Sequence, residues 1–294
     1  MITVDEAFDK FRKRLELSET EQQDAIRRHN DVRACIRESF DIDRDFLTGS
    51  YARHTKTKPL KDVDIFFCLG ESDRHWRKKP PRDVLTAFET CLGKKYGTDN
   101  VEGGRRCVTV EFDKQNPTAD EEGKVLSNDA VPAYELQGCY EIPDRDLGKW
   151  IKTDPDTHKE RATAKNKECD GKWVPLVKML KRWNRSAGKP ISPSFLIEVM
   201  ALDLVDPPFT KYPSEVRRFF AAAQEGIMRD WPDPAGYGPP VSDQMTSDKR
   251  RKAVEDLRAA EVKATRAVHL EKQGKTGEAL ALWFEIMGKY FPTS

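Results

Sequence analysis

An Asp-Val-Asp segment at the start of an apolar run, residues 62–67, most constrains what this chain can fold into. Successive side chains of an extended strand point to opposite faces, so we expect Asp62 and Asp64 on one face. Val63 and Ile65 would then point the other way, into a hydrophobic core. The pattern predicts a buried strand that holds two carboxylates side by side.

A Gly-Ser pair, Gly49 and Ser50, precedes this strand. Its small side chains and backbone N–H groups suit a phosphate-binding turn. Paired carboxylates offer the hard oxygen ligands that Mg²⁺ prefers. An isolated D-x-D is more often a pair of solvated acids, so the interpretation depends on the order and spacing of both features. Together they predict metal-assisted chemistry on a nucleoside triphosphate.

Two-metal nucleotidyl transfer usually needs a third carboxylate, which completes the site of one ion. Three acids are candidates. Glu111 and Asp113 share the polar face of a predicted strand at 106–112, where Thr109 also lies, and Asp129 directly precedes an Ala-Val-Pro-Ala segment. An acid on a strand face is often an ordinary solvent-facing residue, so the pattern by itself leaves this choice open.

Charge and cysteine content exclude several classes of protein. Charged residues make up 34% of the chain, yet the formal net charge is +1, without the basic excess of a general nucleic-acid binder. The six cysteines show no C-x-x-C spacing, which argues against a disulfide scaffold or a structural zinc. The sequence has no signal pattern and no run of 18 apolar residues, so we expect a soluble, cytoplasmic protein.

The apolar periodicity predicts a mixed first part and a helical second part. In the first part we expect two helices within 4–40 that break near Leu17-Ser18, a helix at 81–96, a strand at 106–112, a polar loop at 116–127, and short strands from 129 and 140. In the second part we expect helices at 173–185 and 194–204, a Pro- and Gly-rich surface segment at 207–246, and two helices within 248–291. The apolar positions expected to be buried in the first two helices are Phe8, Phe11, Leu15, Ile26, Val32 and Ile36.

Segments along nearly the whole chain resemble the CD-NTase family, the bacterial relatives of cyclic GMP–AMP synthase and oligoadenylate synthase. They read GSYARHTKTKPLKDVDIFF, NDAVPAYE, YEIPDR, WIKTDP, AKNK, PLVKMLKRWNR and ALALWFEIMGKYFP. The resemblance implies an α+β fold. A polymerase-β-like nucleotidyltransferase lobe with a mixed sheet, residues 1–155 including the N-terminal helices, would pack against an oligoadenylate-synthase-C-like helical lobe, residues 156–294. The active site would lie in the cleft between the lobes.

The resemblance also implies roles for single residues. Gly49 and Ser50 would bind the triphosphate, and Asp62 and Asp64 would hold two Mg²⁺ ions, for which Mn²⁺ can substitute. The acid before the Val-Pro-Ala segment is a metal ligand in the family, so Asp129 is preferred as the third ligand. It would hold the catalytic ion and assist deprotonation of the attacking ribose hydroxyl.

Three further residues are implied in the second lobe. Lys178 or Lys181 would reach the β- and γ-phosphates; Lys178 matches the family position better, and the alternative is a solvated helix lysine. Ser194 matches a family serine at the triphosphate, although the histidine that relatives often carry nearby is missing from this segment. Asn166 would face a base, although a lone asparagine is more often a helix cap.

The implied activity is a cyclic oligonucleotide synthase that joins ATP and/or GTP with release of pyrophosphate. We expect a purine cyclic dinucleotide such as cyclic GMP–AMP, used as a second messenger in anti-phage defence. We expect a monomer that needs neither nucleic acid nor a membrane; an activating partner protein is left open. The alternatives are a transferase that modifies RNA or protein, which the near-neutral charge disfavours for tRNA, and an inactive nucleotide-binding relative, which the retained carboxylates disfavour.

Overall fold

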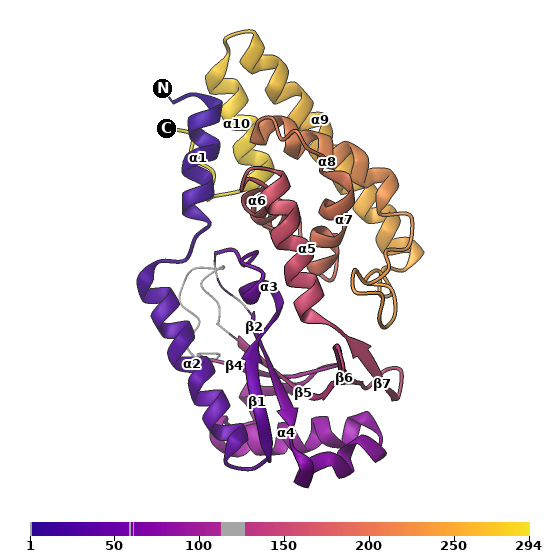
Figure 1. Cartoon of the computed structure of the whole chain (residues 1–294). Coiled ribbons are helices and arrows are strands. Elements are labelled where there is room, and N and C mark those ends of the chain that lie inside the picture. The colour runs from indigo at the N-terminus through magenta and orange to yellow at the C-terminus, as the bar shows by residue number, and fades with distance from the viewer. Residues whose placement is uncertain (1, 59, 61, 113–126) are drawn as a thin grey trace. The chain divides into compact units, whose positions relative to one another are not determined.

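The computed structural model describes residues 2–58, 60, 62–112 and 127–294 (Figure 1). The chain divides into two compact units: a sheet unit, residues 17–158, and a helical unit, which combines residues 1–16 with 159–294. The sequence predicts a boundary after residue 155, with the first helix in the sheet lobe. The structure instead assigns that helix, α1 (Val4–Arg14), to the helical unit.

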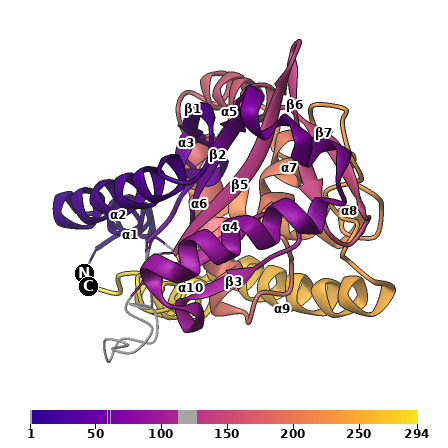
Figure 2. The same cartoon turned by 90° about the horizontal axis from the view of Figure 1, so that it is seen from below.

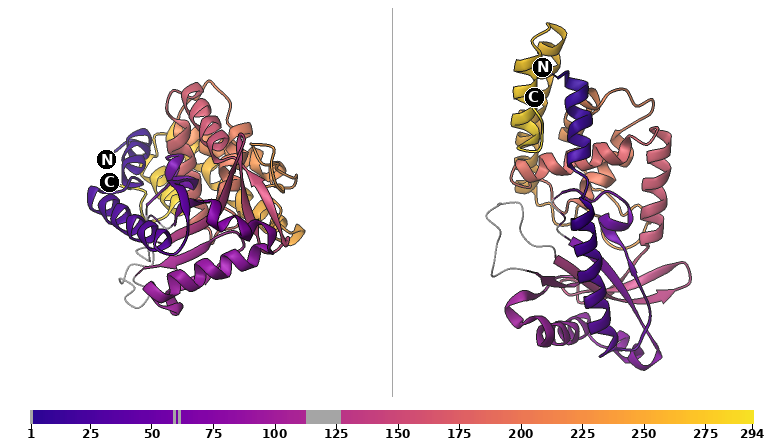
Figure 3. Two further views of the ribbon diagram at one scale, coloured as in Figure 1. Left: turned by 60° about the horizontal axis from the view of Figure 1, so that its bottom comes forward. Right: turned by 90° about the vertical axis from the view of Figure 1, so that its left-hand side faces the viewer.

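Aromatic packing explains where α1 belongs. The ring of Phe8 lies 4.9 Å from that of Trp283 and 5.1 Å from that of Phe291, measured between centroids. Trp283 is in the last helix, α10 (Thr276–Met287), and α1 runs beside α10 in the right panel of Figure 3. Periodicity predicts that α1 has a buried face, but not which distant element covers it.

The break between the first two helices lies where the sequence predicts it. Ser18 caps the second helix, α2 (Glu19–Arg37), by accepting from the backbone N–H of Glu21, while the Glu21 carboxylate accepts the Ser18 N–H at 2.7 Å. This reciprocal capping box satisfies donors at the start of the helix. A new helix therefore starts at residue 19 instead of α1 continuing.

A seven-stranded sheet forms from the described residues of the sheet unit. Its strands are β1 (Ile42–Leu47), β2 (Asp62–Leu69), β3 (Val101–Gly103), β4 (Val108–Glu111), β5 (Ser127–Leu136), β6 (Cys139–Asp144) and β7 (Lys149–Thr153). The main order is β1-β2-β5-β4-β3, with β6 on β5 and β7 on β6. Among the strands of the described residues, β2 and β5 are the one parallel pair. β5 is longer than the short strand predicted, and β1, β3 and β7 were not predicted. The predicted loop at 116–127 lies outside the described residues except for Ser127, which instead begins β5.

Helices α2 and α4 (Pro81–Tyr96) cover one face of this sheet (Figure 2). Val63, Ile65 and Phe67 of β2 are fully buried, as their alternation predicts. The buried stripe of α4 is also confirmed, with Phe88 against Phe67 at a ring distance of 5.9 Å. The prediction for Ile26 is wrong: it is 41% exposed. The buried side of α2 carries Ala25, His29, Val32, Cys35 and Ile36.

The helical unit contains, besides α1 and α10, the helices α5 (Pro155–Glu168, which begins at the end of the sheet unit), α6 (Trp173–Ser186), α7 (Phe195–Leu204), α8 (Tyr212–Gly226) and α9 (Ser247–Lys272). Short helical turns in the sheet unit are α3 (Gly49–Ala52), η1 (Glu71–Lys78) and η2 (Thr98–Asn100). The prediction of a surface segment over 207–246 is wrong for α8, which buries Phe219 and Phe220. Its Pro213 lies in the first helical turn, where proline is tolerated because that N–H has no helical acceptor.

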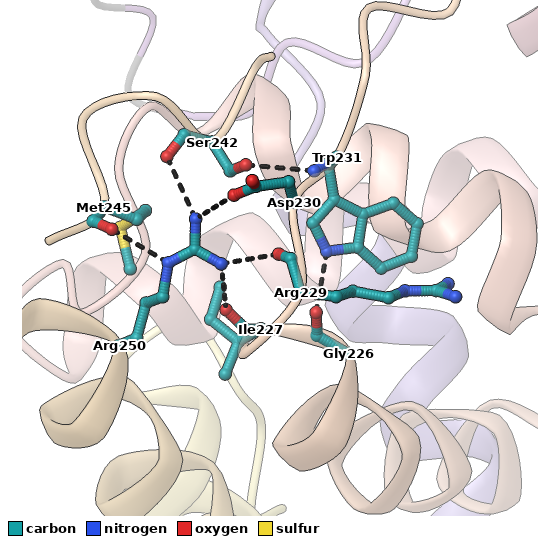
Figure 4. Close-up of polar contacts among 8 residues, drawn as sticks. All are labelled: Gly226, Ile227, Arg229, Asp230, Trp231, Ser242, Met245 and Arg250. Carbon is teal, nitrogen blue, oxygen red and sulfur yellow. Dashed lines mark hydrogen bonds and ion pairs between the residues drawn. The ribbon is translucent and has the colours of Figure 1, made fainter. Parts of the chain in front are cut away.

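Arg250 of α9 contacts several points of the rest of that segment (Figure 4). Its guanidinium donates to the backbone oxygens of Ile227, Arg229 and Met245 at 3.2, 2.6 and 2.8 Å, and pairs with Asp230 at 2.6 Å. A planar group with five donors can bind several carbonyls at once.

Among the described residues, none of the helices combines the length and the apolar character that a membrane-spanning segment needs.

Candidate active site

The register of two parallel strands brings three carboxylates together. Asp64 of β2 lies opposite Asp129 of β5, and Asp62 lies opposite Ser127. Neighbouring strands are about 4.8 Å apart, so Asp64 and Asp129 are immediate neighbours on the same side of the sheet. This side is opposite to the one that α2 and α4 cover, because Ile65 and Phe67 pack against residues of those helices.

The electrostatics of this face show how close the carboxylates are. Burial and the negative charge of Asp64 raise the pKa of Asp129 to about 7, and the charge of Asp62 acts in the same direction. The hydroxyl of Thr109 opposes this shift by donating to Asp129 Oδ1 at 2.6 Å. Three carboxylates that repel one another make a face that favours a cation.

The Gly-Ser turn lies against the same acids. Gly49 and Ser50 open the short helix α3, directly after Thr48, whose backbone N–H donates to the carbonyl oxygen of Asp64 at 2.9 Å. Gly49 has a φ of +61°, and a β-carbon there would lie 1.6 Å from Asp64 Oδ2. Only glycine therefore fits between this turn and the carboxylate.

Within the described ranges, no three His, Cys, Asp or Glu side chains form a ready-made cage for a metal ion. Mg²⁺ is usually bound by one or two carboxylates together with substrate phosphates and waters, and not by an all-protein cage. Asp62, Asp64 and Asp129 supply the right ligand type for that mode, and the turn at Gly49 adjoins them. The residues present therefore fit Mg²⁺ bound together with a nucleotide.

Two residues that support these acids were not singled out from the sequence. Thr109 donates to Asp129, and Ser127 Oγ donates to Asp62 Oδ1 at 3.2 Å. The alternating pattern at 106–112 already placed Thr109 on the polar face and could have identified it. The rival acid Glu111 pairs with Ser127 on the far side of β5 from Asp62, and Asp113 lies outside the described residues.

The two candidate lysines of α6 are buried in ion pairs. Lys178 Nζ lies 2.6 and 2.8 Å from the two carboxylate oxygens of Glu16, and its side chain is 6% exposed. Lys181 Nζ lies 2.5 Å from Glu198, on α7, and both side chains are almost fully buried. The alternative of a solvated helix lysine is therefore wrong for both residues.

Asn166 acts as a helix cap, but for the following helix. Its Oδ1 accepts the backbone N–H of Val174, in the first turn of α6, at 2.9 Å. Ser194 is exposed and immediately precedes α7. Both belong to the helical unit, and the structure assigns neither of them a ligand.

Comparison with known proteins identifies the family. Residues 1–166 match the model of the Second Messenger Oligonucleotide or Dinucleotide Synthetase domain. The chain is 27% identical to a cyclic AMP-AMP-AMP synthase of an Acinetobacter species, over all of this chain and 87% of that protein.

Solved structures show the same fold. The structure of Escherichia coli MS115-1 CdnC with ATP has a TM-score of 0.73 at 18% identity, covering 99% of both chains. The complex of CdnC with HORMA-deltaN has a TM-score of 0.70 at 16% identity, covering 98% of both. The predicted fold class, a mixed sheet with helices and a helical C-terminal part, is thus confirmed. The chain belongs to the Second Messenger Oligonucleotide or Dinucleotide Synthetase family, and it is a bacterial CD-NTase, a nucleotidyltransferase that makes cyclic oligonucleotides.

Proposed function

We propose that this enzyme uses Mg²⁺ to join ATP into a cyclic oligoadenylate, with cyclic AMP-AMP-AMP as the product. The observation that carries the metal-dependent reaction is the placement of Asp62, Asp64 and Asp129 on one sheet face, with Gly49 against Asp64. The choice of product is supported by the relative that matches all of this chain. The cyclic GMP–AMP expected from the sequence is the rival product.

In the proposed mechanism, Gly49 and Ser50 bind the triphosphate through their backbone at the start of α3. Asp62 and Asp64 would hold the metal ions, and Asp129 would be the third ligand, to the catalytic ion. Bound Mg²⁺ would polarise the α-phosphate and favour ionisation of the attacking hydroxyl. Without a bound cation, burial and the charges of Asp64 and Asp62 raise the pKa of Asp129 to about 7, so this face favours a bound cation. Asp129 would assist deprotonation of the attacking hydroxyl through the ion that it holds.

Three residues of the helical unit are also proposed to contact the nucleotide. Lys178 binds the β- and γ-phosphates, Ser194 contacts the triphosphate, and Asn166 faces a base. The proposed role of Lys178 is supported by the direction of its side chain, because its ammonium already binds a carboxylate outside α6.

We further propose that the product is a second messenger in anti-phage defence. A HORMA protein is a candidate activating partner, since the structurally similar CdnC forms a complex with HORMA-deltaN. Full activity of the isolated chain would make such a partner unnecessary.

The test is incubation with Mg²⁺ and labelled triphosphates, omitting one nucleotide at a time, followed by the mass of the phosphatase-resistant product. We expect a cyclic adenylate trimer from ATP alone and no product from Asp64→Asn. Glu135→Gln, which neutralises an exposed carboxylate of β5, should keep the activity. A product that requires GTP would favour the dinucleotide. Label on RNA or protein, with none in small cyclic species, would contradict the proposal.

A further inference from the structure

Lys178, the proposed phosphate ligand, already binds an anion in this structure. In the described part of the chain, both hydrogen bonds of its ammonium end on the carboxylate of Glu16. A lysine ammonium has three N–H donors and no acceptor. Glu16 thus engages the charge that a triphosphate would use.

The pair with Glu16 differs from the neighbouring buried pair. Glu198, the partner of Lys181, lies on a helix and its side chain is 3% exposed. Glu16 lies in the bend between α1 and α2, and its side chain is 51% exposed. Water can solvate the Glu16 carboxylate when it leaves, whereas the buried Lys178 ammonium then needs another anion, which a bound triphosphate would supply. The Glu16 side chain can therefore leave without unfolding a helix.

The charges of Glu16 and a nucleotide oppose each other. A triphosphate brought to Lys178 Nζ would meet the Glu16 carboxylate, whose oxygens lie 2.6 and 2.8 Å from that atom. Two anions on one ammonium lie close together and repel each other, and the repulsion falls when one of them moves into water. Binding would thus require Glu16 to withdraw.

We propose that Glu16 is an affinity-determining residue: it competes with the substrate triphosphate for Lys178 and lowers the affinity for nucleotide. This inference rests on the proposed role of Lys178 as a phosphate ligand. Glu16 is also the last residue of the N-terminal part of the helical unit, and the sheet unit begins at residue 17.

The experiment is calorimetric titration of the full chain, in Mg²⁺, with an ATP analogue that carries a methylene group between the α- and β-phosphorus atoms. We expect Glu16→Gln to tighten binding about threefold or more, because the triphosphate no longer competes with a carboxylate for the buried ammonium. Lys178→Gln should weaken binding about tenfold or more, as for loss of charged hydrogen bonds. The double variant should bind like Lys178→Gln alone, because Glu16 acts only through Lys178.

Glu285→Gln is the matched control. Glu285 is also half-exposed, belongs to the helical unit and pairs with a lysine, Lys263, at 2.8 Å. It should leave the affinity unchanged, and thermal unfolding of every variant checks the fold. Glu16→Ala provides a second removal of the carboxylate if the glutamine variant unfolds early.

Unchanged or weaker binding by both Glu16 variants would overturn the inference, as would wild-type affinity in Lys178→Gln. Either result leaves the proposed function standing if wild-type protein forms the cyclic product and Asp64→Asn does not. If the wild-type protein forms no cyclic product but the affinities of the variants shift as expected, the proposed function is rejected. The inference that Glu16 competes with the triphosphate for Lys178 then stands.

Discussion

The backbone of Gly49 approaches the side chain of Asp64 so closely that a β-carbon at Gly49 would lie 1.6 Å from Oδ2. The phosphate-binding turn and the metal-binding carboxylate of the proposed site are therefore in direct contact. The space between them is set by the absence of a side chain. A change at Gly49 should move Asp64 directly.

Gly49→Ala should lower product formation about 100-fold or more, because displaced metal ligands are costly for activity. The matched control is Gly138→Ala. Gly138 also has a positive φ, +78°, but no heavy atom lies within 4 Å of its added β-carbon. Both variants should lose about 1–2 kcal/mol of stability from backbone strain. Similar activity of the two variants would mean that the contact with Asp64 is unimportant.

Asp129→Asn should change the pH dependence of stability in EDTA. The folded-state pKa of Asp129, about 7, lies above the value of an unfolded aspartate, about 3.9. The folded protein therefore holds this proton more tightly, and as the pH rises from about 4 to about 7 the wild type loses stability through this residue. The variant lacks that loss. The unfolding free energy of the variant minus that of the wild type should therefore increase from about pH 4 to about pH 7 and stay constant at higher pH.

Urea unfolding of both proteins at a series of pH values measures the difference. A constant difference from pH 4 to 8 would show that Asp129 does not titrate in this window. In Mg²⁺, Asp129→Asn should also lose activity, because an amide is a poorer ligand for this ion than a carboxylate.

Asn166→Ala should lower the unfolding free energy by about 1 kcal/mol, since it removes the hydrogen bond that caps α6 at Val174. Asn166→Asp keeps an oxygen acceptor and should retain most of that stability. If Asn166 also contacts a base, both variants should weaken nucleotide binding. Normal binding by the aspartate variant would leave Asn166 with the capping role alone.

Arg250→Lys should loosen the segment 227–246, because one ammonium cannot replace the fork that reaches Ile227, Arg229 and Met245. We expect a loss of about 2 kcal/mol, the scale of two or more buried hydrogen bonds. Limited proteolysis should cut this segment faster than in the wild type. Arg251→Lys, at an exposed neighbour that pairs with Asp248 on its own helix, should have little effect.

Local patterns predicted much of the fold because the interactions behind them are local. Period-two alternation identified Val63, Ile65 and Phe67 as the buried side of β2, and the capping residue Ser18 marks the start of α2. Helical periodicity failed at Ile26, because the buried side of α2 passes through Ala25 instead. The prediction was also wrong at α8, because the proline and glycine content of 207–246 indicated a surface segment instead of a helix.

The sequence by itself determined the elements and the ligand types of the site: an Asp-Val-Asp strand, a Gly-Ser turn and three candidate third acids. Only the tertiary structure decided that Asp129 lies opposite Asp64, while Glu111 is separated from Asp62 by β5. It also decided that Lys178 pairs with Glu16. These partners are 65 and 162 residues apart in the chain. Periodicity reports which side of an element is buried, whereas partners at that separation are chosen by the register and packing of the whole fold.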